Sequence, residues 1–166
     1  MDWNLARERL GAELIGAREA VAARFRQSLR EQGRFALALE QCAAELVLQA
    51  GAALSDEMPP EAPWRRCGSV LRIDARTQGR TLFPELTALW KSMATTVSRV
   101  AMSVDEDRRA RDVLGGQLEA TLRGASAELR RALLDAPIDE ATQRFGGVTV
   151  VCWDGVERES DTEQAA

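Results

Sequence analysis

Histidine and tyrosine are both absent from this 166-residue sequence. Without histidine the chain has no imidazole to act as a general base, to bind haem or zinc, or to accept a phosphoryl group. A di-iron site built on Glu-x-x-His and a Ser-His-Asp or Cys-His catalytic arrangement are excluded for the same reason. We therefore expect a protein without a cofactor, without a metal site and without catalytic residues of these kinds.

Cysteine is scarce as well, with Cys42, Cys67 and Cys152 forming an odd set that contains no C-x-x-C pair. That pattern fits a reducing compartment better than a secreted disulfide framework. The first residues, MDWNLARERL, carry charge from the second position and have no apolar stretch, so we expect no signal peptide. No apolar run approaches the roughly 20 residues that a membrane span needs. The sequence thus predicts a cytoplasmic protein that does not enter a membrane.

Excess positive charge is also lacking, because 22 basic residues face 26 acidic ones and the net charge is -4. The two signs are interspersed along the chain, whereas a nucleic-acid surface needs concentrated positive charge. We therefore expect no nucleic-acid partner. Lys91 is the single lysine beside 21 arginines, and this bias together with frequent alanine is typical of a GC-rich bacterial genome.

What the sequence does contain is a long apolar stretch, residues 35–54, FALALEQCAAELVLQAGAAL. Its few polar residues recur at helical spacing and form one narrow stripe, so other elements must bury the remaining surface. The stretch therefore predicts the central helix of a mainly α-helical bundle. The polar stripe consists of Glu40, Gln41, Glu45 and Gln49.

Residues 3–31 have the pattern of one long amphipathic helix that ends near Gly33. We expect it to pair with the central helix as an N-terminal helical hairpin over residues 1–55. A ladder of small residues along this helix would let a neighbouring helix approach closely, and the alternative is that the ladder forms the seam of a homodimer. The apolar positions are Leu10, Leu14, Val21, Phe25 and Leu29, and the ladder is Ala12, Gly16, Ala20 and Ala23.

The segment 56–80 begins as a proline-rich linker, because SDEMPPEAP at residues 55–63 cannot continue a helix. Residues 69–75 alternate loosely between apolar and polar side chains, which favours a short strand and leaves a helical turn open. Trp64, Arg65 and Arg66 form a possible contact for an anion or a partner, unless the indole simply packs under the arginine stems. Cys67, beside the two arginines, is expected to be an ordinary free cysteine, and the alternative is a thiol of low pKa.

Residues 81–156 are expected to hold a pair of helices and a terminal hairpin. Apolar residues recur at spacings of four and three after Pro84, which is typical of a bundle seam and marks a possible interaction face. A capping box formed by Ser103 and Glu106 predicts that a second helix begins near Val104 and continues to about residue 135. The bundle would then have about four helices. The interaction face consists of Leu86, Trp90, Met93, Val97 and Val100.

The sequence changes character near its C-terminal end, where VTVVCW at residues 148–153 is followed by Asp154 and Gly155. This pattern predicts a small β-hairpin with a type I′ turn. The residues from 157 to 166 are acidic and poor in apolar side chains, which is typical of a disordered tail.

The hairpin also holds the one pattern that is similar to a catalytic signature. Cys152 to Arg158 fits C-x-x-G-x-x-R, which resembles the phosphate-binding loop of cysteine-dependent phosphatases. In that family the cysteine attacks phosphorus while backbone amides and the arginine hold the phosphoryl oxygens. Here Asp154 and Glu157 would repel phosphate, and Glu159 stands where the family usually has serine or threonine.

The features together favour a non-catalytic bacterial interaction protein that uses helix faces to bind another protein or a second copy of itself. An adaptor, a chaperone, an inhibitor and an assembly subunit are all compatible with this class. The alternative is a helical sensor domain that binds a small apolar ligand between helices, with Trp90, Met93 and Phe83 around the ligand. A cysteine-dependent phosphatase is the remote third possibility.

Overall fold

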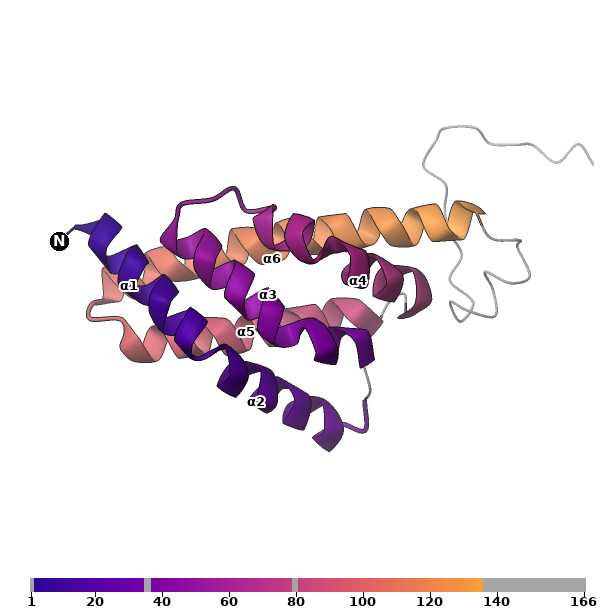
Figure 1. The fold of residues 1–166 in the computed structure, drawn as a ribbon, viewed down its shortest axis with the longest axis horizontal. Coiled ribbons are helices and arrows are strands. Elements are labelled where there is room, and N and C mark those ends of the chain that lie inside the picture. Colours follow the sequence, from indigo (N-terminus) through magenta and orange to yellow (C-terminus); the bar gives the residue numbers. More distant parts are fainter. Residues whose placement is uncertain (1, 35–36, 79–80, 136–166) are drawn as a thin grey trace, which may run out of the picture.

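The protein is a mainly helical bundle in the computed structural model, which describes residues 2–34, 37–78 and 81–135. Six helices and no strand occur within these ranges. They are α1 (Trp3–Gly16), α2 (Arg18–Glu31), α3 (Leu37–Ser55), α4 (Ala62–Gln78), α5 (Leu82–Val100) and α6 (Val104–Asp135). The N-terminus and the end of α6 lie at opposite ends of the elongated bundle (Figure 1).

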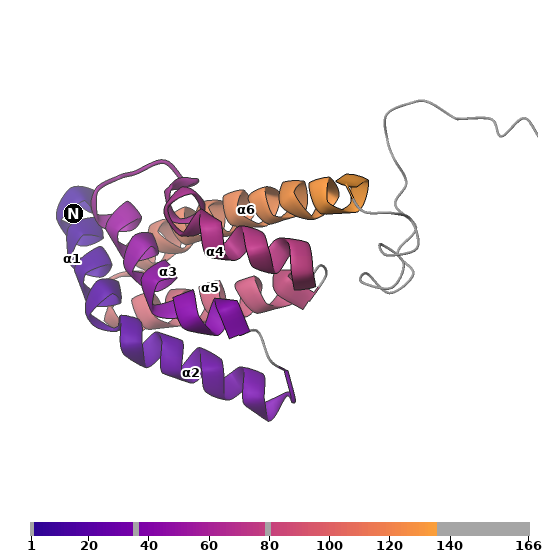
Figure 2. The same cartoon turned by 45° about the vertical axis from the view of Figure 1, so that its right-hand side comes forward.

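The central position of α3 follows from its composition. Leu39, Leu46, Val47 and Leu54 are each at most 1% exposed and belong to the hydrophobic core. The helices α1, α2, α4 and α6 all pack on α3 (Figures 1 and 2). The prediction that the apolar stretch 35–54 forms a buried central helix is therefore confirmed.

Residues 3–31 form two helices, so the prediction of one long helix is wrong at a single position. Ala17 leaves the helical conformation, with φ of -88° and ψ of 1°. The Arg18 guanidinium then donates a hydrogen bond of 3.0 Å to the Ile15 carbonyl and caps the end of α1. The bend lets α1 pack along α3 while α2 reaches both α3 and α5.

The close approach of α1 to α3 is made by Gly11 and Gly51 rather than by the predicted ladder. A Cβ atom on Gly11 would lie 2.6 Å from the Gly51 carbonyl oxygen and 2.7 Å from Cβ of Ser55, so the two backbones touch. The ladder of small residues points away from this contact, because all four of its members are exposed. These members are Ala12, Gly16, Ala20 and Ala23.

The predicted strand at residues 69–75 is wrong, because these residues belong to α4. A helical face explains the segment better, because Trp64, Cys67 and Leu71 follow at spacings of three and four and are all buried. Burial of this face against α3 and α6 outweighs the strand preference of the β-branched residues. The four expected helices thus become six, through this helix and the bend at Ala17.

The corner between α5 and α6 forms as the sequence predicted. The Glu106 N–H donates to the Ser103 hydroxyl at 3.1 Å, and the Glu106 carboxylate accepts from the Met102 N–H at 2.7 Å. Arg9 of α1 fixes the corner from outside, since its guanidinium donates to Glu106 at 2.7 Å and to the Val100 carbonyl at 2.8 Å. The predicted hairpin and acidic tail lie outside the described residues.

Candidate interaction site

The predicted interaction face on α5 is enclosed by the chain's own helices. Leu86, Met93 and Val97 are fully buried, Trp90 is 2% exposed, and Val100 is half-buried at the end of the helix. A partner would reach the first four of these side chains only if the bundle opened. The seam therefore acts within the structure as core, and its contact with another protein stays a prediction.

Trp64, Arg65 and Arg66 do not come together as a site. The Trp64 indole is buried between α4 and α6, and it lies so close to Gly124 that a Cβ atom there would come within 2.7 Å of the ring atom Cδ2. Arg65 and Arg66 are exposed, and Arg66 donates a hydrogen bond of 2.9 Å to the side chain of Gln49. The indole is thus part of the core and does not stack with the two guanidinium groups at the surface.

The structure favours an ordinary free cysteine at position 67 over the alternative of a thiol with a low pKa. The thiol is buried, and this burial raises its pKa to about 11, with a smaller contribution from the negative charge of Glu45. Cys42 is buried as well. Cys152 and Arg158, which carry the resemblance to phosphatases, lie outside the described residues. Within residues 2–34, 37–78 and 81–135, no three His, Cys, Asp or Glu side chains gather as metal ligands.

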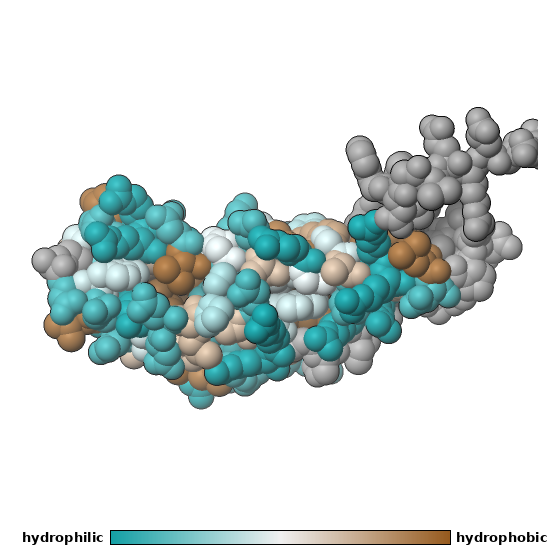
Figure 3. Space-filling view, turned by 90° about the horizontal axis from the view of Figure 1, so that it is seen from above, coloured by the Kyte–Doolittle hydropathy of each residue, from teal (hydrophilic) through white to brown (hydrophobic). Residues whose placement is uncertain are grey.

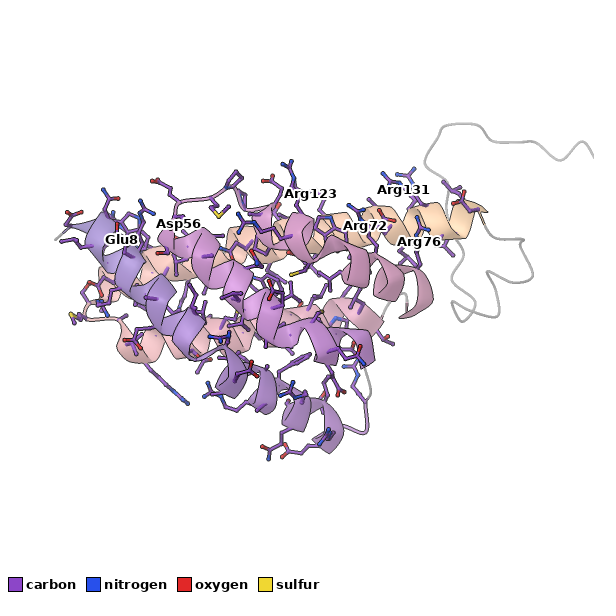
Figure 4. The ribbon with its side chains drawn as sticks, viewed as in Figure 1. Glu8, Asp56, Arg72, Arg76, Arg123 and Arg131 are labelled. Carbon is purple, nitrogen blue, oxygen red and sulfur yellow. The ribbon has the colours of Figure 1, made fainter. Side chains whose placement is uncertain are left out.

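An arginine cluster that the sequence did not predict lies where α4 and α6 run side by side (Figure 4). Arg76 donates to Oε2 of Glu128 through Nε at 3.3 Å and Nη2 at 3.2 Å. Arg131 donates to Oε1 of the same carboxylate at 2.9 Å, and Nε of Arg72 lies 3.7 Å from Oε1. We call Arg72, Arg76 and Arg131 the arginine face.

The electrostatics of the arginine face are unbalanced. The Glu128 side chain is only 6% exposed, whereas the three arginine side chains are 51 to 65% exposed. Within the described part of the chain, one carboxylate therefore compensates one of three positive charges, and about half of each arginine side chain is open to solvent. A fourth arginine, Arg123, lies nearby on α6 and pairs with Glu119 at 2.8 Å (Figure 4).

Little in the sequence indicates the arginine face. Arg72 and Arg76 are four residues apart, which places them on one side of a helix, but residues 69–75 were interpreted as a possible strand. Nothing local shows that Glu128 and Arg131, more than 50 positions later, lie beside them. The face is created by the parallel packing of α4 on α6, which only the fold reveals (Figure 2).

Outside the arginine face, the surface offers no broad apolar area for docking on the side seen in Figure 3. There the brown patches are small and are separated by hydrophilic residues. Among the described residues, the exposed large apolar side chains are Leu5, Met102, Val104 and Leu134.

Comparisons with protein families, with curated proteins and with solved structures found no match to this chain. No helix in the described part of the chain is long and apolar enough to span a membrane. The candidate site is therefore argued from its own geometry alone.

Proposed function

We propose that this chain is a non-catalytic helical interaction protein that binds an acidic segment of a partner protein through the arginine face. It would serve as an adaptor, a chaperone, an inhibitor or an assembly subunit. The observation that carries the proposal is the gathering of three half-exposed guanidinium groups on one buried carboxylate. Among the residues that the structure describes, only Glu128 pairs with these three arginines, so positive charge is left for a partner to neutralise.

The chemistry of arginine supports an acidic partner. Each guanidinium has five N–H donors in a planar fork, and the hydrogen bonds to Glu128 use two of those of Arg76 and one of those of Arg131. The remaining donors match the two oxygens of a carboxylate, with which arginine forms bidentate pairs. Glu128 also holds the stems in place, which lowers the entropy lost when a partner binds.

The distribution of charge supports a protein partner over a nucleic acid. The whole chain carries a net charge of -4, which opposes the approach of a long polyanion. At the other end of the bundle Glu8 and Asp56 lie on the surface, so the arginine face is a local feature (Figure 4). A short run of Asp or Glu side chains would fit its extent, and complementary charge would mainly set the association rate and specificity.

The proposal is tested by fluorescence anisotropy with a labelled peptide of eight glutamates and the full-length chain. We expect binding that weakens as salt is added, because exposed charges are screened. The double variant Arg76→Gln with Arg131→Gln should lose about tenfold in affinity, since each exposed charge pair contributes up to about 1 kcal/mol.

The matched control is the double variant Arg108→Gln with Arg109→Gln. It removes the same charge from the other half of α6, where both arginines pair with Asp105 at 2.5 Å and 2.9 Å. This control should bind the peptide nearly as the wild type does. Equal losses in both double variants, or no binding by the wild type, would refute the proposal. Tighter binding of a single-stranded oligonucleotide at the same residues would assign the face to nucleic acid instead.

A further inference from the structure

A pocket of about 200 Å³ lies between α5 and α6, away from the arginine face. Trp90 and Ala94 of α5, together with Leu114 and Leu118 of α6, give it an apolar lining, and Gly115 contributes only backbone. Two exposed cations, Lys91 and Arg111, complete the lining. The pocket therefore combines an apolar floor with positive charge at its exposed side.

From this combination we infer that the pocket binds a small apolar carboxylate, such as a molecule with one aromatic ring and a short acid chain. A cavity of about 150 Å³ accommodates benzene, so about 200 Å³ leaves room for one ring and a few further atoms. The apolar part would lie on the Trp90 side, and the carboxylate would face Lys91 and Arg111. This binding activity goes beyond the proposed recognition of an acidic protein segment.

The two cations differ in the ion pairs and hydrogen bonds that their side chains already make within the chain. Arg111 donates to Asp107 at 3.0 Å and to the Ser98 hydroxyl at 2.8 Å, so its position is fixed and its charge is partly balanced. Lys91 has no ion pair or side-chain hydrogen bond among the residues that the structure describes. Lys91 is thus the charge that a ligand carboxylate would neutralise, with Arg111 as a second, weaker contact.

The Trp90 side chain forms the buried wall of the pocket. It is 2% exposed, and its Nε1 donor is buried without an acceptor among the described residues. A buried polar group without a partner is unfavourable by about 1–3 kcal/mol, and native proteins rarely retain one. The indole ring lines the pocket while its Nε1 atom is shielded from solvent, so a ligand beside the ring would change the surroundings of the indole N–H without accepting its hydrogen bond.

The experiment uses the full-length chain, labelled with ¹⁵N, and 4-phenylbutyrate as the probe. The indole N–H signals are followed during the titration, and Trp90→Phe identifies the signal of Trp90. We expect the Trp90 signal to shift and saturate while those of Trp3 and Trp64, which lie outside the pocket, stay in place. No shift of the Trp90 signal at millimolar probe would overturn the inference.

The role of charge is tested by Lys91→Gln, which should weaken 4-phenylbutyrate binding roughly fivefold, as expected for an exposed ion pair. The matched control is Arg99→Gln, which removes one positive charge from the same helix outside the pocket. The neutral analogue 4-phenylbutanol should bind more weakly than the acid. Equal binding of acid and alcohol, or equal effects of the two variants, would contradict a carboxylate site.

The location is tested by filling the pocket. A Cβ atom on Gly115 would meet no heavy atom within 4 Å, so Gly115→Leu adds a side chain toward open space and should fold normally. It should abolish binding of the probe while the acidic peptide still binds the arginine face. Retained binding of the probe in the folded variant would place the ligand elsewhere and overturn the inference. If Gly115→Leu lost binding of both the probe and the acidic peptide, the inference that the two sites are separate would be contradicted.

Discussion

The burial of single side chains decides several features of this protein, and Gly124 is the clearest case. Trp64 can lie between α4 and α6 only because position 124 has no side chain. Gly115, two and a half turns earlier on the same helix, meets no such neighbour. The packing therefore requires glycine at position 124 and does not require it at position 115. Substitution of each glycine by alanine distinguishes the two cases.

We predict that Gly124→Ala lowers the free energy of unfolding by about 1–3 kcal/mol, because the added methyl group overlaps the Trp64 ring. Gly115→Ala should raise the same quantity by roughly 0.5–1 kcal/mol, as alanine favours the helix. Urea unfolding followed by circular dichroism measures both. If both variants changed the free energy of unfolding in the same direction, the packing of Trp64 against Gly124 would be contradicted.

Cys67 shows how burial controls reactivity at the residue scale. With its pKa raised to about 11 by burial, only about one thiol in ten thousand is ionised near pH 7. We predict that iodoacetamide leaves Cys67 unmodified in the folded protein and alkylates it after unfolding in urea. Peptide mass spectrometry gives the result for each cysteine separately. Rapid alkylation of Cys67 in the folded chain would show that the thiol is accessible.

At the scale of the elements, local signals predicted some boundaries well. The capping box placed the start of α6 correctly because its hydrogen bonds lie within a few residues of one another. The burial of α3 was predictable because its composition leaves only one narrow polar stripe to face solvent. The bend at Ala17 and the helix at residues 69–75 were missed, since both depend on contacts with distant helices that a local pattern does not contain.

The corner between α5 and α6 depends on Glu106, whose side chain is 6% exposed and accepts from Met102 and Arg9. We predict that Glu106→Ala lowers the free energy of unfolding by about 1–3 kcal/mol, because the part-buried hydrogen bonds from Met102 and Arg9 lose their acceptor. Glu119→Ala, which removes an exposed partner of Arg123 on the same helix, should change it by less than about 0.5 kcal/mol. Chemical denaturation of the two variants makes the comparison, and equal effects would contradict this role of Glu106.

The same corner makes stability depend on pH through Asp107. A hydrogen bond from Ser98, supported by the Arg111 guanidinium, lowers the pKa of Asp107 from its ordinary value of 3.8. A carboxyl with a lowered pKa in the folded state contributes stability above its unfolded pKa and loses it as the pH falls through the folded value. The stability advantage of the wild type over Asp107→Asn should therefore be present near pH 6 and shrink below about pH 4. Urea unfolding across this range measures it, and an advantage that grows in acid would refute the assignment.

At the scale of the whole molecule, the candidate site is a product of the fold. Arg72 and Arg76 come from α4, whereas Glu128 and Arg131 come from α6, and only the packing of the two helices joins them. The seam Leu86 to Val97 shows the converse case, since its clean heptad spacing predicted a binding face and the bundle itself buries it. Periodicity reveals that a face is apolar, but it does not reveal whether the chain's own helices or another protein cover that face.

The central claim is that the arginine face binds acidic protein segments, and mapping the contact by NMR tests it most directly. The octaglutamate peptide is titrated into ¹⁵N-labelled protein, and both backbone amide and arginine Nε–H signals are recorded. We predict shifts centred on Arg72, Arg76 and Arg131, with the Lys91 and Trp90 region unchanged. Shifts that spread evenly over all exposed arginines, or that centre on the α5–α6 corner, would contradict the account.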